Sequence, residues 1–442
     1  MTTTIAEKPG IQRVSFYTLG CKLNQAETDG IATLFRQRKY RVVPFKEEAD
    51  LTFINTCTVT AEADAKCRQI IRQSQQASPA GRIVVAGCFS QVQSDKIAAM
   101  HGIDMILGTR EKFNILDLIR LLEGERNEEP LVWVGDMGNA ATYDDVPLIS
   151  MPSRTRAFLK VQDGCDYKCG YCIVPLARGK GRSRALDDCL TEARWLAAEG
   201  YEELVLTGVN IGTWEDDQDR FHDLLEAISE VDGLRRIRIS SVEPNLITDE
   251  LIKLVKQRDN IAPHFHIPMQ HASDTVLGAM KRRYRMRDYE GMLSRIVADI
   301  PDAALGTDVI VGYPGETDGD FKSLIKALES LPLTYHHIFR YSEREGTAAC
   351  TMTGTVDPGE RKRRSSVLRD VSRNRRQQTA QQMLGQVRIV HIEQQNESKV
   401  WEGFTDNYLR VQVPLPKAPE DSFVPVELTD YDDPYFKGRL TT

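Results

Sequence analysis

Residues 157–172 read AFLKVQDGCDYKCGYC. The apolar run at the start of this stretch predicts a strand, and a turn with three cysteines follows it. Short apolar runs continue to alternate with helical patterns as far as about Arg376, which predicts a parallel sheet with helices between its strands. The strands expected are Ala157–Val161, Glu203–Thr207, Arg236–Ser240, His264–Pro268, Leu305–Val311 and Tyr335–Tyr341. These units are too few for a closed eight-stranded barrel, so we expect a partial (β/α)6 barrel with its site at the carboxyl ends of the strands.

The cysteines of this stretch, Cys165, Cys169 and Cys172, have the spacing C-x3-C-x2-C. Zinc sites usually present two cysteine pairs, and bacterial ferredoxin runs include a fourth cysteine, so a zinc site or a plain ferredoxin site is the less favoured interpretation. No fourth cysteine is near, because Cys189 falls in a predicted helix. Three thiolates can hold a four-iron cluster and leave one iron open to bind a substrate.

The block from residue 11 to 125 has three more cysteines in matching positions. Its apolar runs predict parallel strands, each followed by a turn and a helical pattern: Val14–Tyr17, Leu51–Ile54 and Ile83–Ala86. The turns carry Cys21, Cys57 and Cys88, and the carboxyl edge of such a sheet can gather all three. Three buried structural thiols are the alternative. Cys67, in a predicted helix, could compete with Cys57 as a ligand.

The remaining segments complete an α/β multidomain chain. Residues 126–152 are polar and rich in Asp, Asn and Pro, which suits a linker between an N-terminal domain (11–125) and a central domain (153–376). Residues 377–442 contain short β-rich runs separated by turns, which predict a small antiparallel β-barrel. These runs are Val387–Ile392, Tyr408–Val413 and Val424–Leu428.

The composition is that of an ordinary globular protein. Of 442 residues, 41% are hydrophobic and 27% are charged, which excludes a disordered chain, a collagen-like chain and a small disulfide scaffold. The net charge of −7 means that any contact with nucleic acid needs local basic patches. An odd number of cysteines, no signal-like stretch from Met1 to Gly10 and no apolar run of about 18 residues predict a cytoplasmic location and no membrane contact.

Four motifs carry a family resemblance. CDYKCGYC resembles the motif of radical S-adenosylmethionine (SAM) enzymes, on the partial barrel typical of that superfamily. TLGCKLNQAET (18–28), INTCTVT (54–60) and VAGCFSQ (85–91) resemble the methylthiotransferase domain, and the C-terminal barrel resembles the TRAM domain. Together they cover nearly the whole chain in the order of the radical SAM methylthiotransferase family, so the chain resembles an enzyme of that family.

The resemblance implies two [4Fe–4S] clusters and SAM as cofactors. Cys165, Cys169 and Cys172 would hold the radical SAM cluster, and Cys21, Cys57 and Cys88 would hold an auxiliary cluster. No catalytic residue is expected beyond these cluster ligands. The SAM contacts implied are Tyr171, Thr207, Gly208, Asn210, Ser241, Glu243, Gln270 and Val309.

The resemblance also implies a reaction. The segments around Cys21 and Cys57 are most similar to the MtaB type, whose substrate is N6-threonylcarbamoyladenosine at position 37 of tRNA. One SAM would methylate a sulfur carried on the auxiliary cluster, a second would supply a radical, and the methylthio group would go to C2. Alternatives within the family are N6-isopentenyladenosine in tRNA and an aspartate of a ribosomal protein. An alternative of another class is a non-catalytic RNA-binding iron–sulfur sensor.

Three basic clusters are candidates for contact with the tRNA anticodon loop, at 178–184, 281–287 and 361–376. Solvated surface charge is the alternative interpretation of each. The residues expected to contact RNA are Arg178, Arg182, Arg184, Arg282, Arg283, Arg363 and Arg364. Residues 377–442 are acidic overall, which does not favour RNA binding by the C-terminal barrel. The family implies an electron donor such as flavodoxin or ferredoxin, and the sulfur donor stays open.

Overall fold

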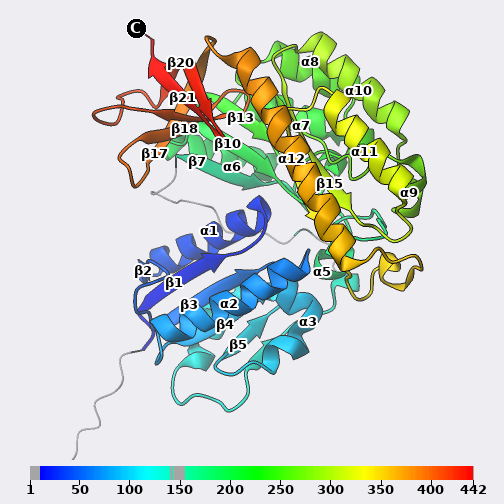
Figure 1. The fold of residues 1–442 in the computed structure, drawn as a ribbon. Helices are drawn as coiled ribbons and strands as arrows, with labels where there is room; N and C mark the ends of the chain where they lie inside the picture. The colour runs from blue at the N-terminus through cyan, green and yellow to red at the C-terminus, as the bar shows by residue number, and fades with distance from the viewer. Residues whose placement is uncertain (1–9, 140–142, 144–154, 442) are drawn as a thin grey trace, which may run out of the picture. The chain divides into compact units, whose positions relative to one another are not determined.

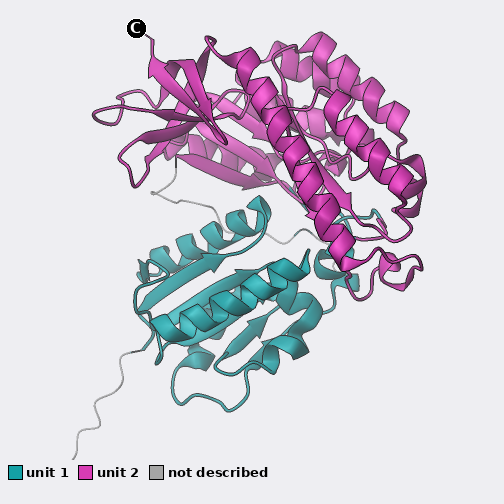
Figure 2. Ribbon diagram, in the orientation of Figure 1, with its two compact units in different colours: residues 1–151, 162–167, 172–182 teal, residues 152–161, 168–171, 183–442 magenta. Residues whose placement is uncertain are grey.

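The computed structural model describes residues 10–139, 143 and 155–441. These fall into two compact units, shown in different colours in Figure 2. The first comprises residues 1–151, 162–167 and 172–182, and the second comprises 152–161, 168–171 and 183–442. The prediction of an N-terminus without a signal sequence falls on residues 1–9, outside the described residues, as does part of the predicted linker (140–142 and 144–152).

The first unit is built on a six-stranded sheet in the order β2-β1-β3-β4-β5-β6, in which every pair is parallel. The strands are β1 (Arg13–Thr18), β2 (Arg41–Val43), β3 (Leu51–Thr56), β4 (Arg82–Gly87), β5 (Met105–Leu107) and β6 (Leu131–Trp133). The helices include α1 (Lys22–Gln37), α2 (Ala61–Ala77), α3 (Cys88–Ala98), α4 (Ile115–Leu118) and α5 (Val174–Arg178). Figure 1 shows α2 lying across β3 and β4.

Burial explains which strands of this sheet the sequence predicts. All six residues of β3 are buried, so both faces of the strand are covered, and its apolar residues Leu51, Phe53 and Ile54 mark it in the sequence. By contrast, β2, β5 and β6 have three residues each, and such short runs cannot be told from the start of a helix by pattern alone. The helix α2 starts where the Thr60 side chain accepts a hydrogen bond from the Ala63 N–H.

The second unit contains the expected partial barrel. Its parallel strands are β7 (Arg156–Lys160), β10 (Glu203–Thr207), β13 (Arg236–Ile239), β14 (His264–His266), β15 (Ala304–Val311) and β16 (Tyr335–Arg340). They form two three-stranded sheets, and isolated parallel bridges such as Ser241–His266 connect β13 to β14. The short strands β11 (Glu215–Asp216) and β12 (Asp219–Arg220) accompany them, whereas β8 (Gln162–Asp163) is grouped with the first unit and β9 (Arg182–Ser183) is divided between the two.

Helices follow the barrel strands and cover the apolar core of the second unit. They are α6 (Leu186–Ala198), α7 (Phe221–Ser229), α8 (Asp249–Gln257), α9 (Asp274–Ala279), α10 (Met286–Asp299), α11 (Asp318–Ser330) and α12 (Pro358–Met383). The basic run 361–376 lies within α12, the long orange helix of Figure 1, which contacts β16 and α11. Part of that run therefore faces the protein and not solvent.

The chain ends in a closed five-stranded barrel in the order β17-β18-β19-β21-β20. Its strands are β17 (Val387–Gln395), β18 (Trp401–Thr405), β19 (Arg410–Val413), β20 (Phe423–Asp432) and β21 (Tyr435–Leu440). The barrel is confirmed, but β19 and β21 pair in parallel, so it is not antiparallel throughout. Glu203 connects it to the larger barrel, since its carboxylate contacts both Arg238 Nε at 2.6 Å and His391 Nδ1 at 3.0 Å.

Candidate active site

The three N-terminal cysteines lie at the carboxyl ends of adjacent strands. Cys21 follows β1, Cys57 follows β3 and Cys88 follows β4, and these strands are neighbours in the sheet. The turns touch closely, because a Cβ added to Gly20 would stand 2.9 Å from Cys57 Sγ. Gly20 also has φ +98°, which a residue with an L side chain rarely adopts. The turn therefore needs glycine both for its backbone conformation and for its closeness to Cys57.

The pKa of Cys57 also indicates that the three cysteines lie close together. Burial raises the pKa of this thiol well above its usual range, and the charges of Cys88 and Cys21 raise it further. Thiolates gathered at one edge are the donor set that iron–sulfur clusters use, and an iron in their midst would offset the desolvation of the thiolates. The three side chains therefore fit a cluster.

Cys67 has a different environment. Its Sγ–H donates to the Cys57 carbonyl oxygen at 3.3 Å, and its side chain belongs to an apolar cluster that includes Ile70 and Ile71. Burial raises the pKa of Cys67 to about 12. The thiol thus supports the Cys57 turn from α2, which favours Cys57 over Cys67 as a ligand.

The second cysteine triplet lies on the loop after β7, where all three side chains are half-buried. Cys165 and Cys172 are grouped with the first unit and Cys169 with the second. In the first unit, the Cys165 N–H donates to Gly179 O at 3.0 Å. In the second unit, the Gly170 N–H donates to Met280 O at 2.9 Å, and Cys169 Sγ accepts from Arg282 Nη1 at 3.4 Å. Each part of the loop is therefore fixed by its own unit.

The predicted SAM contacts of the second unit lie at the carboxyl ends of the barrel strands. Thr207 ends β10, and Ser241 and Glu243 follow β13. Gln270 follows β14 and forms a parallel bridge with Val309 of β15. Thr207 Oγ1 is buried and has no hydrogen-bond partner among the described residues. Such an orphaned polar atom fits a pocket that a polar ligand completes. The other predicted contacts, Tyr171, Gly208 and Asn210, lie on the adjoining loops.

Arg282, which the sequence predicted as an RNA contact, lies beside the predicted cluster ligand Cys169. Its side chain is only 1% exposed and forms an ion pair with Glu243. Besides Cys169 Sγ, Nη1 also lies 3.3 Å from Tyr171 Oη. Burial alone lowers the pKa of Arg282, but Tyr171, Tyr284 and Glu243 outweigh burial and raise it. Arg282 is therefore a fixed cation beside a predicted cluster ligand, and its burial argues against the expectation that it contacts RNA.

Comparisons with known proteins identify the family of the chain. The model described as Uncharacterized protein family UPF0004 matches residues 13–108, and that of the Radical SAM superfamily matches residues 159–328. The chain is 36% identical over 437 residues to the threonylcarbamoyladenosine tRNA methylthiotransferase MtaB of Bacillus subtilis (strain 168), which covers 97% of this chain and 96% of that protein. The chain belongs to the MtaB-like radical SAM methylthiotransferases.

This methylthiotransferase is also similar to a second sequence relative and to a solved structure. The ribosomal protein uS12 methylthiotransferase RimO of Desulfitobacterium hafniense (strain Y51) is 31% identical over 400 residues, 89% of each chain. The solved structure of the radical SAM methyltransferase TsrM from Kitasatospora setae, with cobalamin and a [4Fe–4S] cluster bound, superposes with a TM-score of 0.59 at 17% identity over 77% of each chain. This structural likeness concerns the fold.

Family membership settles the class of chemistry. As a radical SAM methylthiotransferase, the protein uses iron–sulfur clusters and SAM as cofactors. Within the described residues, no helix combines the length and the apolar character that a bilayer crossing requires.

Most of the arginines expected to contact RNA are buried in this methylthiotransferase, which argues against that expectation. Their charges are neutralised inside the protein, which is the arrangement that a planar guanidinium favours. Arg178 pairs with Glu27 and Asp163, Arg182 with Asp163, Arg184 with Glu192, and Arg364 with Glu316 and Asp318. Arg283 and Arg363 are exposed, and Arg363 binds Glu360.

One polar group near the predicted SAM contacts was not expected from the sequence. His266, Asp308 and His337 offer ligand atoms that all lie within 4.8 Å of one another. The Ser241 Oγ lies 2.7 Å from His266 Nδ1, and His266 Nε2 lies 3.2 Å from Asp308 Oδ1. His266 lies on β14, Asp308 on β15 and His337 on β16, but each of these strands carries further polar residues, so the strand pattern alone does not single out the three.

Proposed function

We propose that this methylthiotransferase transfers a methylthio group to C2 of N6-threonylcarbamoyladenosine at position 37 of tRNA, with two SAM molecules and a sulfur carried on an auxiliary cluster. The observation that carries the proposal is the 36% identity over 97% of the chain to a relative named for that substrate. The RimO relative, 31% identical over 89% of the chain, supports a ribosomal-protein aspartate as the alternative substrate.

The cluster ligands proposed are Cys21, Cys57 and Cys88 for the auxiliary cluster and Cys165, Cys169 and Cys172 for the radical SAM cluster. When bound, SAM and the radical SAM cluster supply a 5′-deoxyadenosyl radical, and the auxiliary cluster carries the sulfur. In support, both triplets leave one iron without a cysteine, and the N-terminal triplet lies at one edge of a parallel sheet.

The side chains around the barrel mouth would bind and orient SAM. Thr207 Oγ1 offers an unused polar atom at the end of β10, and Gln270, which follows β14, forms a backbone bridge with Val309 of β15. The ion pair of Arg282 with Glu243 holds a carboxylate in reach of the same end of the barrel. Burial of these polar groups excludes water, which strengthens their electrostatic interaction with a bound ligand.

For the anticodon loop we propose a smaller basic surface than the sequence suggested. It consists of the exposed residues Lys281, Arg283 and Arg287, together with Arg363 on α12. Arg287 is 85% exposed at its side chain, so it can follow a flexible backbone. Contacts between such residues and phosphates give affinity that depends on salt.

We also propose the domain limits 11–125, 126–152, 153–376 and 377–442, a cytoplasmic location, and flavodoxin or ferredoxin as the electron donor. The C-terminal domain would be a TRAM domain. The closed barrel of this last domain begins at Val387, and the limit between 376 and 377 falls within α12, which ends at Met383.

The substrate is tested by mass spectrometry of tRNA nucleosides from a deletion strain with and without the gene restored. Loss and recovery of the 2-methylthio derivative of N6-threonylcarbamoyladenosine is the expected result. Loss of the methylthio-isopentenyl nucleoside instead, or of the methylthio group on ribosomal protein uS12, would overturn the proposed substrate. A reduced, reconstituted enzyme that forms no 5′-deoxyadenosine from SAM without oxygen would favour a non-catalytic iron–sulfur sensor.

A further inference from the structure

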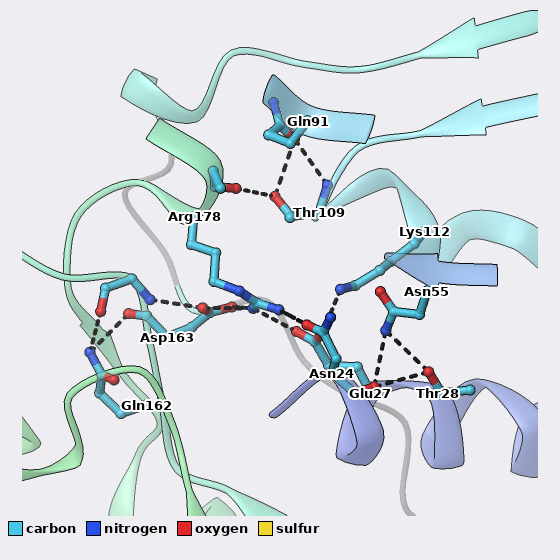
Figure 3. Close-up of polar contacts among 12 residues, drawn as sticks. Asn24, Glu27, Thr28, Asn55, Gln91, Thr109, Lys112, Gln162, Asp163 and Arg178 are labelled. Atoms are coloured by element: carbon cyan, nitrogen blue, oxygen red, sulfur yellow. Dashed lines mark hydrogen bonds and ion pairs between the residues drawn. The ribbon is translucent and has the colours of Figure 1, made fainter. Parts of the chain in front are cut away.

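Arg178 ends α5, six residues after Cys172, and is only 2% exposed. Figure 3 shows its guanidinium among carboxylate and amide side chains of the first unit. Nη1 donates to Glu27 Oε1 and to Asp163 Oδ1, both at 2.9 Å. Nη2 donates to Asn24 Oδ1 at 2.6 Å and to Glu27 Oε2 at 2.9 Å. One planar fork thus joins Asp163 to Asn24 and Glu27 of α1, which are distant from it in sequence.

Asn24 leads from this fork to the N-terminal cysteines. While its Oδ1 accepts from Arg178, its Nδ2 donates to Leu19 O at 2.8 Å and to Thr56 O at 2.9 Å. Leu19 lies two residues before Cys21, and Thr56 lies directly before Cys57. A single amide therefore ties together the two cysteine-bearing turns, and Arg178 fixes which way that amide faces.

Asp163 leads from the fork to the second triplet. Its Oδ1 accepts both from Arg178 Nη1 and from the Gly164 N–H, at 2.8 Å in the latter case, and Gly164 precedes Cys165. The residue after Arg178 binds the same segment, because Gly179 O accepts the Cys165 N–H at 3.0 Å. The segments pack without free space, since a Cβ on Gly164 would stand 1.9 Å from Lys180 O.

The charges of this network are arranged to keep Arg178 in place. Lys112, which is fully buried, forms an ion pair with Glu27, so cations and carboxylates alternate. Burial alone lowers the pKa of Arg178, but Asp163 and Glu27 outweigh burial and hold it well above its usual value. A backbone contact adds to this, since Thr109 Oγ1 donates to Ala177 O at 2.9 Å, one residue before Arg178 (Figure 3).

We propose that Arg178 is a positioning residue shared by the two cysteine triplets. Through Asn24 it fixes the turns of Cys21 and Cys57, and through Asp163 it fixes the segment of Cys165. The inference rests on the proposed function, because it takes both triplets to be cluster ligands. Arg178 itself acts through these neighbours, as residues behind the ligands of a metal site commonly do.

The test uses two full-length parents, each with one cluster. One parent carries Cys21→Ala, Cys57→Ala and Cys88→Ala, and the other carries Cys165→Ala, Cys169→Ala and Cys172→Ala. Arg178→Lys is added to each, because lysine keeps the charge but cannot reach all three partners. The matched control is Arg184→Lys, which changes an arginine that is also buried but pairs with Glu192 in the second unit. Iron release to a chelator and the EPR spectrum of the reduced cluster are measured.

Arg178→Lys should speed iron release by about tenfold or more in both parents and alter both EPR spectra, whereas Arg184→Lys should do neither. A purely structural role would lower the unfolding temperature of the apoprotein without changing the spectrum of the cluster that forms. An effect in one parent only, or in neither, would overturn the shared role. If the parent without Cys165, Cys169 and Cys172 holds no iron even with Arg178 intact, the proposed function itself fails, and the inference fails with it.

Discussion

Arg282 lies between Glu243 and Cys169: Nη1 is 3.3 Å from Glu243 Oε1 and 3.4 Å from Cys169 Sγ. Removal of one partner of a buried ion pair leaves an uncompensated charge at a cost of about 3–5 kcal/mol. Arg282→Gln should therefore lower the rate of 5′-deoxyadenosine formation by about tenfold or more. The matched control is Arg295→Gln, because Arg295 is an exposed arginine on α10 that pairs with Asp249. Equal loss in both variants would contradict a role for Arg282 in this site.

Cys67 should be separable from Cys57 by iron content. Cys67→Ala removes the hydrogen bond from Sγ to Cys57 O, which should lower the free energy of unfolding by about 1 kcal/mol and leave iron binding intact. Cys57→Ala should instead remove about four of eight irons per chain. Iron and labile sulfide are measured after anaerobic reconstitution. A loss of iron in Cys67→Ala as large as that in Cys57→Ala would assign the ligand to α2.

Loss of exposed charge should weaken RNA binding in a salt-dependent way. Substitution of Lys281, Arg283 and Arg287 by Gln should lower affinity for an anticodon stem-loop and reduce the slope of log K against log salt by about 0.7 for each lost phosphate contact. The control is Arg184→Lys, which alters a buried cation. An unchanged slope in the triple variant would place the RNA surface elsewhere.

The free energy of unfolding should fall at acid pH because of Glu203. Burial alone raises the pKa of Glu203, but Arg238 and His391 outweigh burial and hold it well below its usual value. A carboxylate with a depressed pKa contributes stability above its unfolded pKa of about 4.3, and this contribution is lost as the pH falls.

Glu203→Gln should therefore destabilise the apoprotein at pH 7 by about 3–5 kcal/mol, and the difference from the wild type should shrink towards pH 3. Denaturant unfolding at several pH values measures it, with the half-exposed Glu202→Gln as the control. A difference that stays constant with pH would show that the ion pair does not set the acid stability.

The sequence was most informative where chemistry and local pattern coincide. Strand ends at β1, β3 and β4 could be predicted because buried parallel strands are apolar runs, and Cys21, Cys57 and Cys88 follow them directly. The short strands β18 and β21 and the parallel pairing of β19 with β21 could not, because register depends on contacts between distant residues.

The arginines show the same limit for the site. Arg178 lies in a local run of basic residues, and nothing in that run reveals that Glu27, 151 positions earlier, neutralises it. Arg282 likewise meets Glu243 only through the barrel fold. Local charge density therefore predicts a basic segment but cannot say which of its members face solvent.

The central claim, that one triplet generates the radical and the other supplies the group transferred, is tested most directly by one assay of two variants. Reduced enzyme is incubated with SAM and tRNA that carries N6-threonylcarbamoyladenosine, and 5′-deoxyadenosine and the methylthio nucleoside are quantified together by mass spectrometry. Cys169→Ala should form neither product, whereas Cys57→Ala should still cleave SAM but form no methylthio nucleoside. Equal loss of SAM cleavage in both variants, or methylthio product from Cys57→Ala, would contradict the account.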